Sequence, residues 1–194
     1  IGMFRDDLKS LLAFSTVSHL GLITMLLGFG TEAAAVAAVF HIINHAAFKA
    51  ALFMTAGIID HEAGTRSIAR LGGLRKLMPI TFIIGTVSAL SMAGVAPLNG
   101  FLSKELMLES ASHAVWMGHP ALIVTMATIG AMFSVCYSLR FIWQVFFGPE
   151  RHDYPHHPHD PGFGMWVGPG ILAVLVVLIG LFPNQLAGCL VTAS

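Results

Sequence analysis

Charged side chains are scarce in this chain. Lys, Arg, Asp and Glu make up 10% of its 194 residues, whereas hydrophobic residues make up 56%. Soluble domains usually carry about 25% charged residues, so this composition excludes an ordinary water-soluble protein. The formal net charge is zero, which gives no indication of a nucleic-acid partner.

Cysteine is also nearly absent. Cys136 and Cys189 have no motif partner, so we expect neither a disulfide nor a metal site from them. The sequence has no Ser-His-Asp set, no phosphate-binding loop and no cysteine cluster for iron–sulfur chemistry. We therefore expect no cofactor and no redox or hydrolytic centre. No signal-peptide pattern opens the chain, which reads as a piece of something longer.

The chain contains several long apolar runs. They are too long for barrel strands and match the roughly 20 residues that a helix needs to cross a bilayer. We predict an all-α integral membrane protein with about five transmembrane helices. The predicted spans are 8–29, 33–59, 78–114, 120–147 and 165–182.

The third apolar run is interrupted near its middle. Pro97 removes a backbone donor, and Gly94 and Gly100 loosen the chain, so a regular helix cannot continue through residues 97–100. Two short helices crossing twice compete with one discontinuous helix crossing once. In the single crossing, all basic residues other than Lys49 and Lys104 gather on one side, as the positive-inside rule favours. We therefore predict one discontinuous crossing, with the basic side in the cytoplasm.

The second span carries polar residues that lipid alone would not tolerate. His41, His45 and Lys49 follow an i, i+4, i+8 spacing, which places them on one helix face about 6 Å of rise apart. A charge near the middle of a span costs roughly 2.5–3.5 kcal/mol or more. We interpret this row as part of a proton path. The alternative is that single histidines are only hydrogen-bonded to a neighbouring helix.

Lys104 lies one turn beyond the interruption, with Glu105 beside it and Glu109 one turn further on. A nearby carboxylate favours the charged lysine and burial favours the neutral one, so a moving charge would switch its proton. Ordered water would link Lys49, the histidines and Lys104. The alternative for Lys104 is that its side chain snorkels to the membrane surface.

Further candidates lie on the first two spans. Ser15 and His19 share a helix face at i, i+4, where bonding within the bundle is the structural alternative. Asn44 lies within the polar row, and Lys9 stands at the head of its span. The histidine-rich loop 149–160 has three prolines and lacks zinc-type ligand spacing, so we expect a solvated linker and no metal.

Four motifs resemble one family. They are DLKSLLAFSTVSHLG (7–21), FHIINHAAFK (40–49), LGGLR (71–75) and GFLSKE (100–105). Together they are similar to the antiporter-like membrane subunits, the superfamily that joins Mrp-type (Pha-type) cation/proton antiporters to proton-pumping subunits of respiratory complex I. Residues 57–66 and 99–105 look closest to the large A subunit of the Mrp type.

The resemblance implies a fold with two inverted five-helix repeats, each with a discontinuous helix. Residues 1–184 would be most of the second repeat plus one following helix, with residues 185–194 unassigned. Lys49 matches the family's central lysine and Lys104 its lysine at the outer half-channel. Lys9 matches a basic residue for which a surface role is as plausible as a proton role. The first repeat's glutamate and lysine are absent, because that part is absent.

The function implied is exchange of Na⁺ or K⁺ against H⁺ in a bacterial inner membrane, by a multi-pass subunit. Its partners would be lipid, the transported ions and other subunits of the complex. One alternative is a pumping subunit of a complex I-type oxidoreductase, and another is a non-transporting structural subunit.

Overall fold

The computed structural model describes residues 2–114, 119–151 and 154–183. The main helices are α1 (Leu8–Gly28), α2 (Glu32–Ala63), α4 (Pro79–Ala93), α5 (Asn99–His113), α6 (Pro120–Ile142) and α7 (Phe163–Leu181). Three shorter elements are the 3₁₀ turn η1 (Gly2–Phe4), α3 (Leu74–Leu77) and the π-helical turn η2 (Trp143–Phe147). Among the described residues, four helices are long and apolar enough to cross a membrane: α1, α2, α6 continued by η2, and α7. The apolar helix α4 is shorter.

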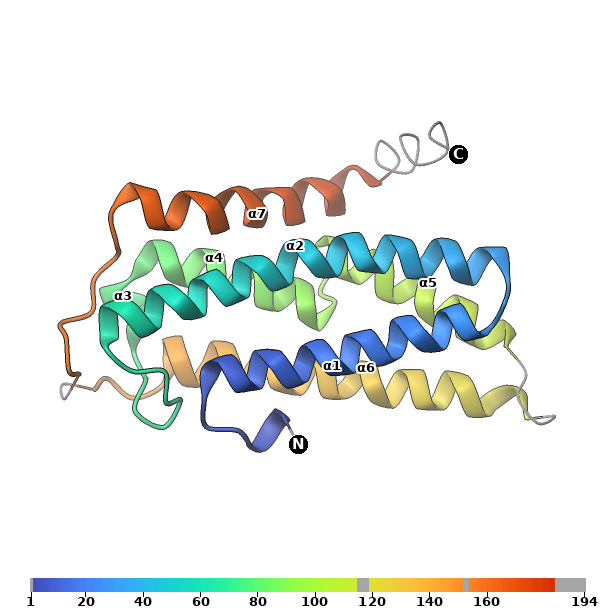
Figure 1. The fold of residues 1–194 in the computed structure, drawn as a ribbon, viewed down its shortest axis with the longest axis horizontal. Coiled ribbons are helices and arrows are strands. Elements are labelled where there is room, and N and C mark those ends of the chain that lie inside the picture. The colour runs from blue at the N-terminus through green and yellow to red at the C-terminus, as the bar shows by residue number, and fades with distance from the viewer. Residues whose placement is uncertain (1, 115–118, 152–153, 184–194) are drawn as a thin grey trace.

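The helices run back and forth along one bundle (Figure 1). α1 runs from one end to the other and α2 returns beside it. α4 begins where α2 ends, and α5 continues beyond the break to the opposite end, from which α6 runs back. The broken segment therefore traverses the bundle once. The predicted all-helical membrane fold with a discontinuous helix is confirmed.

One end of the bundle, which we call the basic end, holds the start of α1, the connection 64–78 and the described residues 148–151 and 154–162 of the connection before α7 (Figure 1). Contacts at this end join Arg140 of α6 to the Met3 carbonyl of η1, and they join the two connections through Arg151 to the Ala69 carbonyl and through Lys76 to Glu150. The basic residues predicted to share one side all belong to this end. They are Arg5, Lys9, Arg66, Arg70, Arg75, Lys76, Arg140 and Arg151.

The basic end is more closely packed than the sequence suggests. Ile68, Leu71, Leu74 and Leu77 recur every third residue, a pattern that by itself predicts a short helical turn lying at the membrane surface, and α3 supplies that turn. However, Ile68, Leu71 and Leu74 are buried in the main core instead of facing lipid. Asp160 also reaches back from the connection before α7. Its carboxylate accepts hydrogen bonds from the Ile80 and Thr81 backbone at 2.8 and 3.0 Å, capping α4.

The break between α4 and α5 is enclosed by neighbouring backbone. Gly94 ends α4 with φ +85°, a left-handed conformation that suits glycine. A Cβ on Gly100 would lie 1.9 Å from the Ser91 carbonyl oxygen, and one on Gly180 of α7 would lie 2.1 Å from the Pro97 oxygen. Non-helical backbone at membrane depth is tolerated only where protein covers it or water reaches it. Here α7 provides part of that cover.

Candidate functional site

Lys49 is buried between α1 and α2, with 4% of its surface exposed. Its Nζ donates to the Leu12 carbonyl oxygen at 3.2 Å and to the Ser15 hydroxyl. The Ser15 hydroxyl in turn donates to the Leu12 oxygen at 2.7 Å. All these partners are neutral. Carbonyl and hydroxyl oxygens accept from either an ammonium or a neutral amine, so they do not fix the lysine in one protonation state.

Three buried histidines cluster beside this lysine. His19 comes from α1, and His41 and His45 come from α2. The His19 ring lies 5.2 Å from that of His41 and 5.3 Å from that of His45, measured between centroids. Phe48 packs edge-on against both His19 and His45. The structure therefore places His19 at the centre of the cluster, although the sequence had marked it only as a secondary candidate.

A chain of hydrogen bonds leaves the cluster towards α5. His19 Nδ1 lies 3.0 Å from His41 Nε2, and His41 Nδ1 lies 2.9 Å from Ser103 Oγ. Ser103 donates its single proton to the Gly100 carbonyl oxygen at 3.3 Å. His41 must then donate to Ser103 and accept from His19. This tautomer assignment, which follows from the bonding network, makes all three bonds point the same way.

Two other nitrogens of the cluster lack a hydrogen-bond partner in the described part of the chain. His19 Nε2 and His45 Nε2 are buried and without a hydrogen bond among the described residues. Buried polar atoms are normally satisfied by protein or by ordered water. The bonding assignment above makes His19 Nε2 an acceptor, so it is the atom at which this row of hydrogen bonds can receive a proton.

Lys104 points into the bundle and does not snorkel to the surface. It is 6% exposed, and its Nζ donates to the Ala93 oxygen at 2.9 Å and to Ser134 Oγ at 2.7 Å. Ser134, on α6, donates to the Met92 oxygen at 2.8 Å. Helix ends leave carbonyl groups without partners, and a lysine commonly fills that need. Lys104 therefore satisfies the last turn of α4 from across the break.

The carboxylates expected near Lys104 do not meet it. Glu105 and Glu109 are exposed, and neither forms an ion pair with a described cation. Adjacent residues on a helix point in different directions, so Glu105 turns away from its neighbour. The expectation that a neighbouring carboxylate holds Lys104 charged is corrected: its partners are a hydroxyl and a carbonyl.

Asn44 fixes the break to α2. Its side chain exchanges hydrogen bonds with Asn99, one to the Asn99 oxygen at 3.2 Å and one from the Asn99 amide at 3.1 Å. The Ser91 hydroxyl donates to Asn99 Oδ1 at 2.5 Å and accepts from the Gly100 backbone at 3.1 Å. Asn44 thus holds the discontinuous helix at a fixed position against the histidine face of α2.

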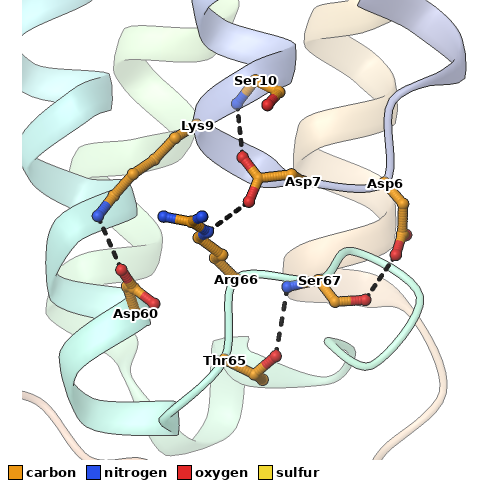
Figure 2. A network of polar contacts seen from close by, with 8 residues as sticks. All are labelled: Asp6, Asp7, Lys9, Ser10, Asp60, Thr65, Arg66 and Ser67. Atoms are coloured by element: carbon orange, nitrogen blue, oxygen red, sulfur yellow. Dashed lines mark hydrogen bonds and ion pairs between the residues drawn. The ribbon is translucent and has the colours of Figure 1, made fainter.

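Lys9 lies at the basic end, away from the buried histidines. Its Nζ is 2.7 Å from Asp60 Oδ2, and its side chain is 39% exposed. Figure 2 shows this pair beside the ion pair between Arg66 and Asp7, in which Nε lies 2.5 Å from Oδ2. Partial burial acts to raise the pKa of Asp7, but the Ser10 hydrogen bond and Arg66 outweigh it and hold that pKa below 3.8. The structure gives Lys9 a surface ion pair.

Residues 1–134 match the family described as NADH:quinone oxidoreductase/Mrp antiporter, TM. The chain belongs to this family. Membership confirms the resemblance carried by the four sequence motifs. The buried histidines, Lys49 and Lys104 all fall within the matched residues.

Individual relatives named as antiporter components are similar to this chain over nearly its whole length. It is 54% identical over 190 residues to the A/B component of a probable K(+)/H(+) antiporter from Rhizobium meliloti, covering 96% of this chain and 19% of the relative. It is 45% identical over 207 residues to the A1 component of a Na(+)/H(+) antiporter from Staphylococcus saprophyticus, covering 96% and 26%. The chain thus spans about a fifth to a quarter of these relatives.

A solved structure of the same family agrees with the fold. The Mrp complex from Dietzia sp. superposes with a TM-score of 0.84 at 39% identity, covering 95% of this chain and 20% of that one.

Three residues that complete the site were not revealed by the sequence patterns. Ser103, Ser134 and Asn99 are fully or almost fully buried and bond to predicted candidates. The only available signal was their position, since Ser103 precedes Lys104 and Asn99 lies within the interruption. Among the described residues, no group of three or more His, Cys, Asp or Glu side chains could hold a metal ion.

Proposed function

We propose that this chain is part of the large A-type component of a monovalent cation/proton antiporter and that it carries a path for protons. The family match and the two relatives named as components of cation/proton antiporters support this proposal. The observation that carries it is the buried histidine cluster between Lys49 and Lys104, with no carboxylate paired to either lysine among the described residues.

Protons move from the Lys49 side to the Lys104 side or in reverse. His45 and His19 receive the proton near Lys49, with ordered water bridging their free nitrogens. His41 passes it to the Ser103 hydroxyl, which releases its own proton through ordered water to Lys104 on the same helix. Imidazole suits this role because each ring can accept a proton at one nitrogen and release another from the second. Lys104 loads or releases the proton at the far side.

The placement in the whole protein follows the family resemblance. Residues 1–184 form most of a second inverted repeat plus one following helix, α7. The basic end faces the cytoplasm of a bacterium, and the helices cross its inner membrane several times. The partners are other subunits of the antiporter complex, membrane lipid, H⁺, and Na⁺ or K⁺. Exchange requires the remainder of the parent protein.

The test compares cation-induced proton flux in inverted vesicles that contain the complete parent complex. Lys49→Met keeps an apolar stem of similar volume and removes the amine, so it should abolish Na⁺- or K⁺-driven flux while the complex still assembles. Lys76→Met is the matched control, because Lys76 is exposed and pairs with Glu150 at the basic end. It should exchange at the wild-type rate.

Other outcomes separate the alternatives. Wild-type flux in Lys49→Met would show that the row of His41, His45 and Lys49 has a structural role, as expected of a non-transporting subunit. Proton movement that follows NADH oxidation and quinone reduction but does not respond to added Na⁺ and K⁺ would identify a redox-driven pump. Either result would overturn the antiporter proposal.

A further inference from the structure

Two neighbouring cavities lie at the basic end, where α6 passes into η2. One has a volume of about 330 Å³ and a mixed lining, to which Arg140, Arg151 and Gln144 contribute charged and polar groups. The other has a volume of about 370 Å³ and an almost entirely apolar lining, including Leu139 and Phe147. Arg140, Trp143 and Gln144 line both cavities. A polar pocket and an apolar groove therefore meet along one stretch of the chain.

The polar pocket carries excess positive charge. Arg140 donates to Gln144 at 2.8 Å and to the Met3 carbonyl, and Arg151 donates to the Ala69 carbonyl at 3.1 Å. Among the described residues, neither arginine has a carboxylate oxygen within 4.0 Å. A guanidinium has five N–H donors, so both arginines keep donors for an anion.

Asp6 is the acidic residue that lines the pocket, and its carboxylate is already engaged. Its Oδ2 accepts from Ser67 Oγ at 2.6 Å, and its Oδ1 accepts from the Ala69 backbone at 2.8 Å. The two arginines and Asp6 leave a formal charge of +1 in the pocket. The pocket therefore suits a single anionic group such as a phosphate diester.

The apolar groove has the features of a membrane interface. Trp143 is 67% exposed and stacks on Phe147, with 5.9 Å between ring centroids. Leu139, one turn earlier on α6, is also exposed. The π-helical turn η2 shifts the helix register here, and such turns are frequent at functional sites. Tryptophan is enriched where the hydrocarbon of a bilayer meets its headgroups.

We propose that these two cavities form a binding site for an anionic phospholipid. The phosphate of the headgroup lies between Arg140 and Arg151, and an acyl chain follows Trp143 and Leu139 along α6 towards the bilayer. Charge complementarity and the continuity of the two cavities support a lipid as the occupant over a protein segment. This inference concerns a surface away from the histidine cluster and does not depend on ion exchange.

The test uses the complete parent complex, delipidated in mild detergent and titrated with phosphatidylglycerol while native mass spectrometry counts bound lipids. Each arginine near a membrane surface contributes enough electrostatic attraction that Arg140→Gln with Arg151→Gln should bind this lipid about 30-fold more weakly. The matched control is Arg5→Gln with Arg70→Gln. It removes two charges from the same end but alters neither cavity, and it should bind like the wild type.

Several results would overturn the proposal. These are equal binding by the Arg140 and Arg151 double variant, equal binding of phosphatidylcholine, or displacement by millimolar inorganic phosphate, which would indicate an anion pocket alone. Cross-linking of Trp143→Cys to another protein of the complex would show that protein occupies the groove. The same spectra report assembly. If the double variant does not assemble, Arg151→Gln alone should still weaken binding about fivefold.

Discussion

Replacing Ser103 by alanine removes one hydroxyl from the hydrogen-bonded chain and leaves the lysines and histidines in place. His41 Nδ1 then loses its partner 2.9 Å away, in a ring that is fully buried. A buried polar group without a partner costs about 1–3 kcal/mol. That cost falls on the state in which His41 carries its proton towards α5, so proton transfer should slow by about 5- to 150-fold.

The assay is cation-driven proton flux in inverted vesicles containing the complete complex, with wild type and variants at matched membrane levels. Ser103→Thr keeps the hydroxyl and should restore most of the flux. Ser112→Ala is the control on the same helix, because within the described part of the chain the exposed Ser112 hydroxyl bonds the Glu109 carbonyl alone, at 2.7 Å. Wild-type flux in Ser103→Ala, combined with loss of flux in Lys49→Met, would refute the role of Ser103 and leave the antiporter proposal intact.

Two further predictions concern stability. Gly180→Val places a Cβ about 2.1 Å from the Pro97 oxygen and should destabilise the purified parent protein by roughly 1–3 kcal/mol in thermal unfolding, whereas Gly164→Val, which meets nothing within 4 Å, should not. Asp7→Asn should lower the unfolding temperature at neutral pH: the pKa of Asp7 is depressed in the folded state, so its stabilisation is present above pH 3.8. That stabilisation is lost as the pH falls through the depressed pKa, so wild type and variant should converge at lower pH; a constant difference would contradict this reasoning.

Much of the fold could be predicted from the sequence, because length and hydropathy decide which segments cross a membrane. The span expected at 165–182 became α7 at Phe163–Leu181, and the interruption around Pro97 separates α4 from α5. Burial around residues 68–77 could not be predicted. An apolar residue every third position fits a surface turn as well as one enclosed by another connection, and only the tertiary fold brings Glu150, Arg151 and Tyr154 against it.

The candidate site was predictable only where its members share one helix. His41, His45 and Lys49 lie on one face because helical spacing requires it. Partners from other helices were beyond such reasoning: Lys104 bonds Ser134, thirty residues away in sequence, where the expected partner was the adjacent Glu105. Composition alone suggests that a carboxylate compensates a buried lysine. Only the packed helices show that the described partners of Lys104 are a carbonyl and a hydroxyl, both neutral.

In the proposed proton path, the one-way order of bonds from His19 through His41 to Ser103 has a consequence for turnover. When one proton has passed along the row, every donor has become an acceptor, and all the hydrogen bonds point in the opposite direction. A second proton cannot follow in the same direction until both rings and the hydroxyl have rotated back. His19 is held edge-on by Phe48, so this resetting requires side chains in the packed interior to give way. The row therefore carries one proton per cycle, and the rate at which it resets depends on how easily the packing around Phe48 loosens.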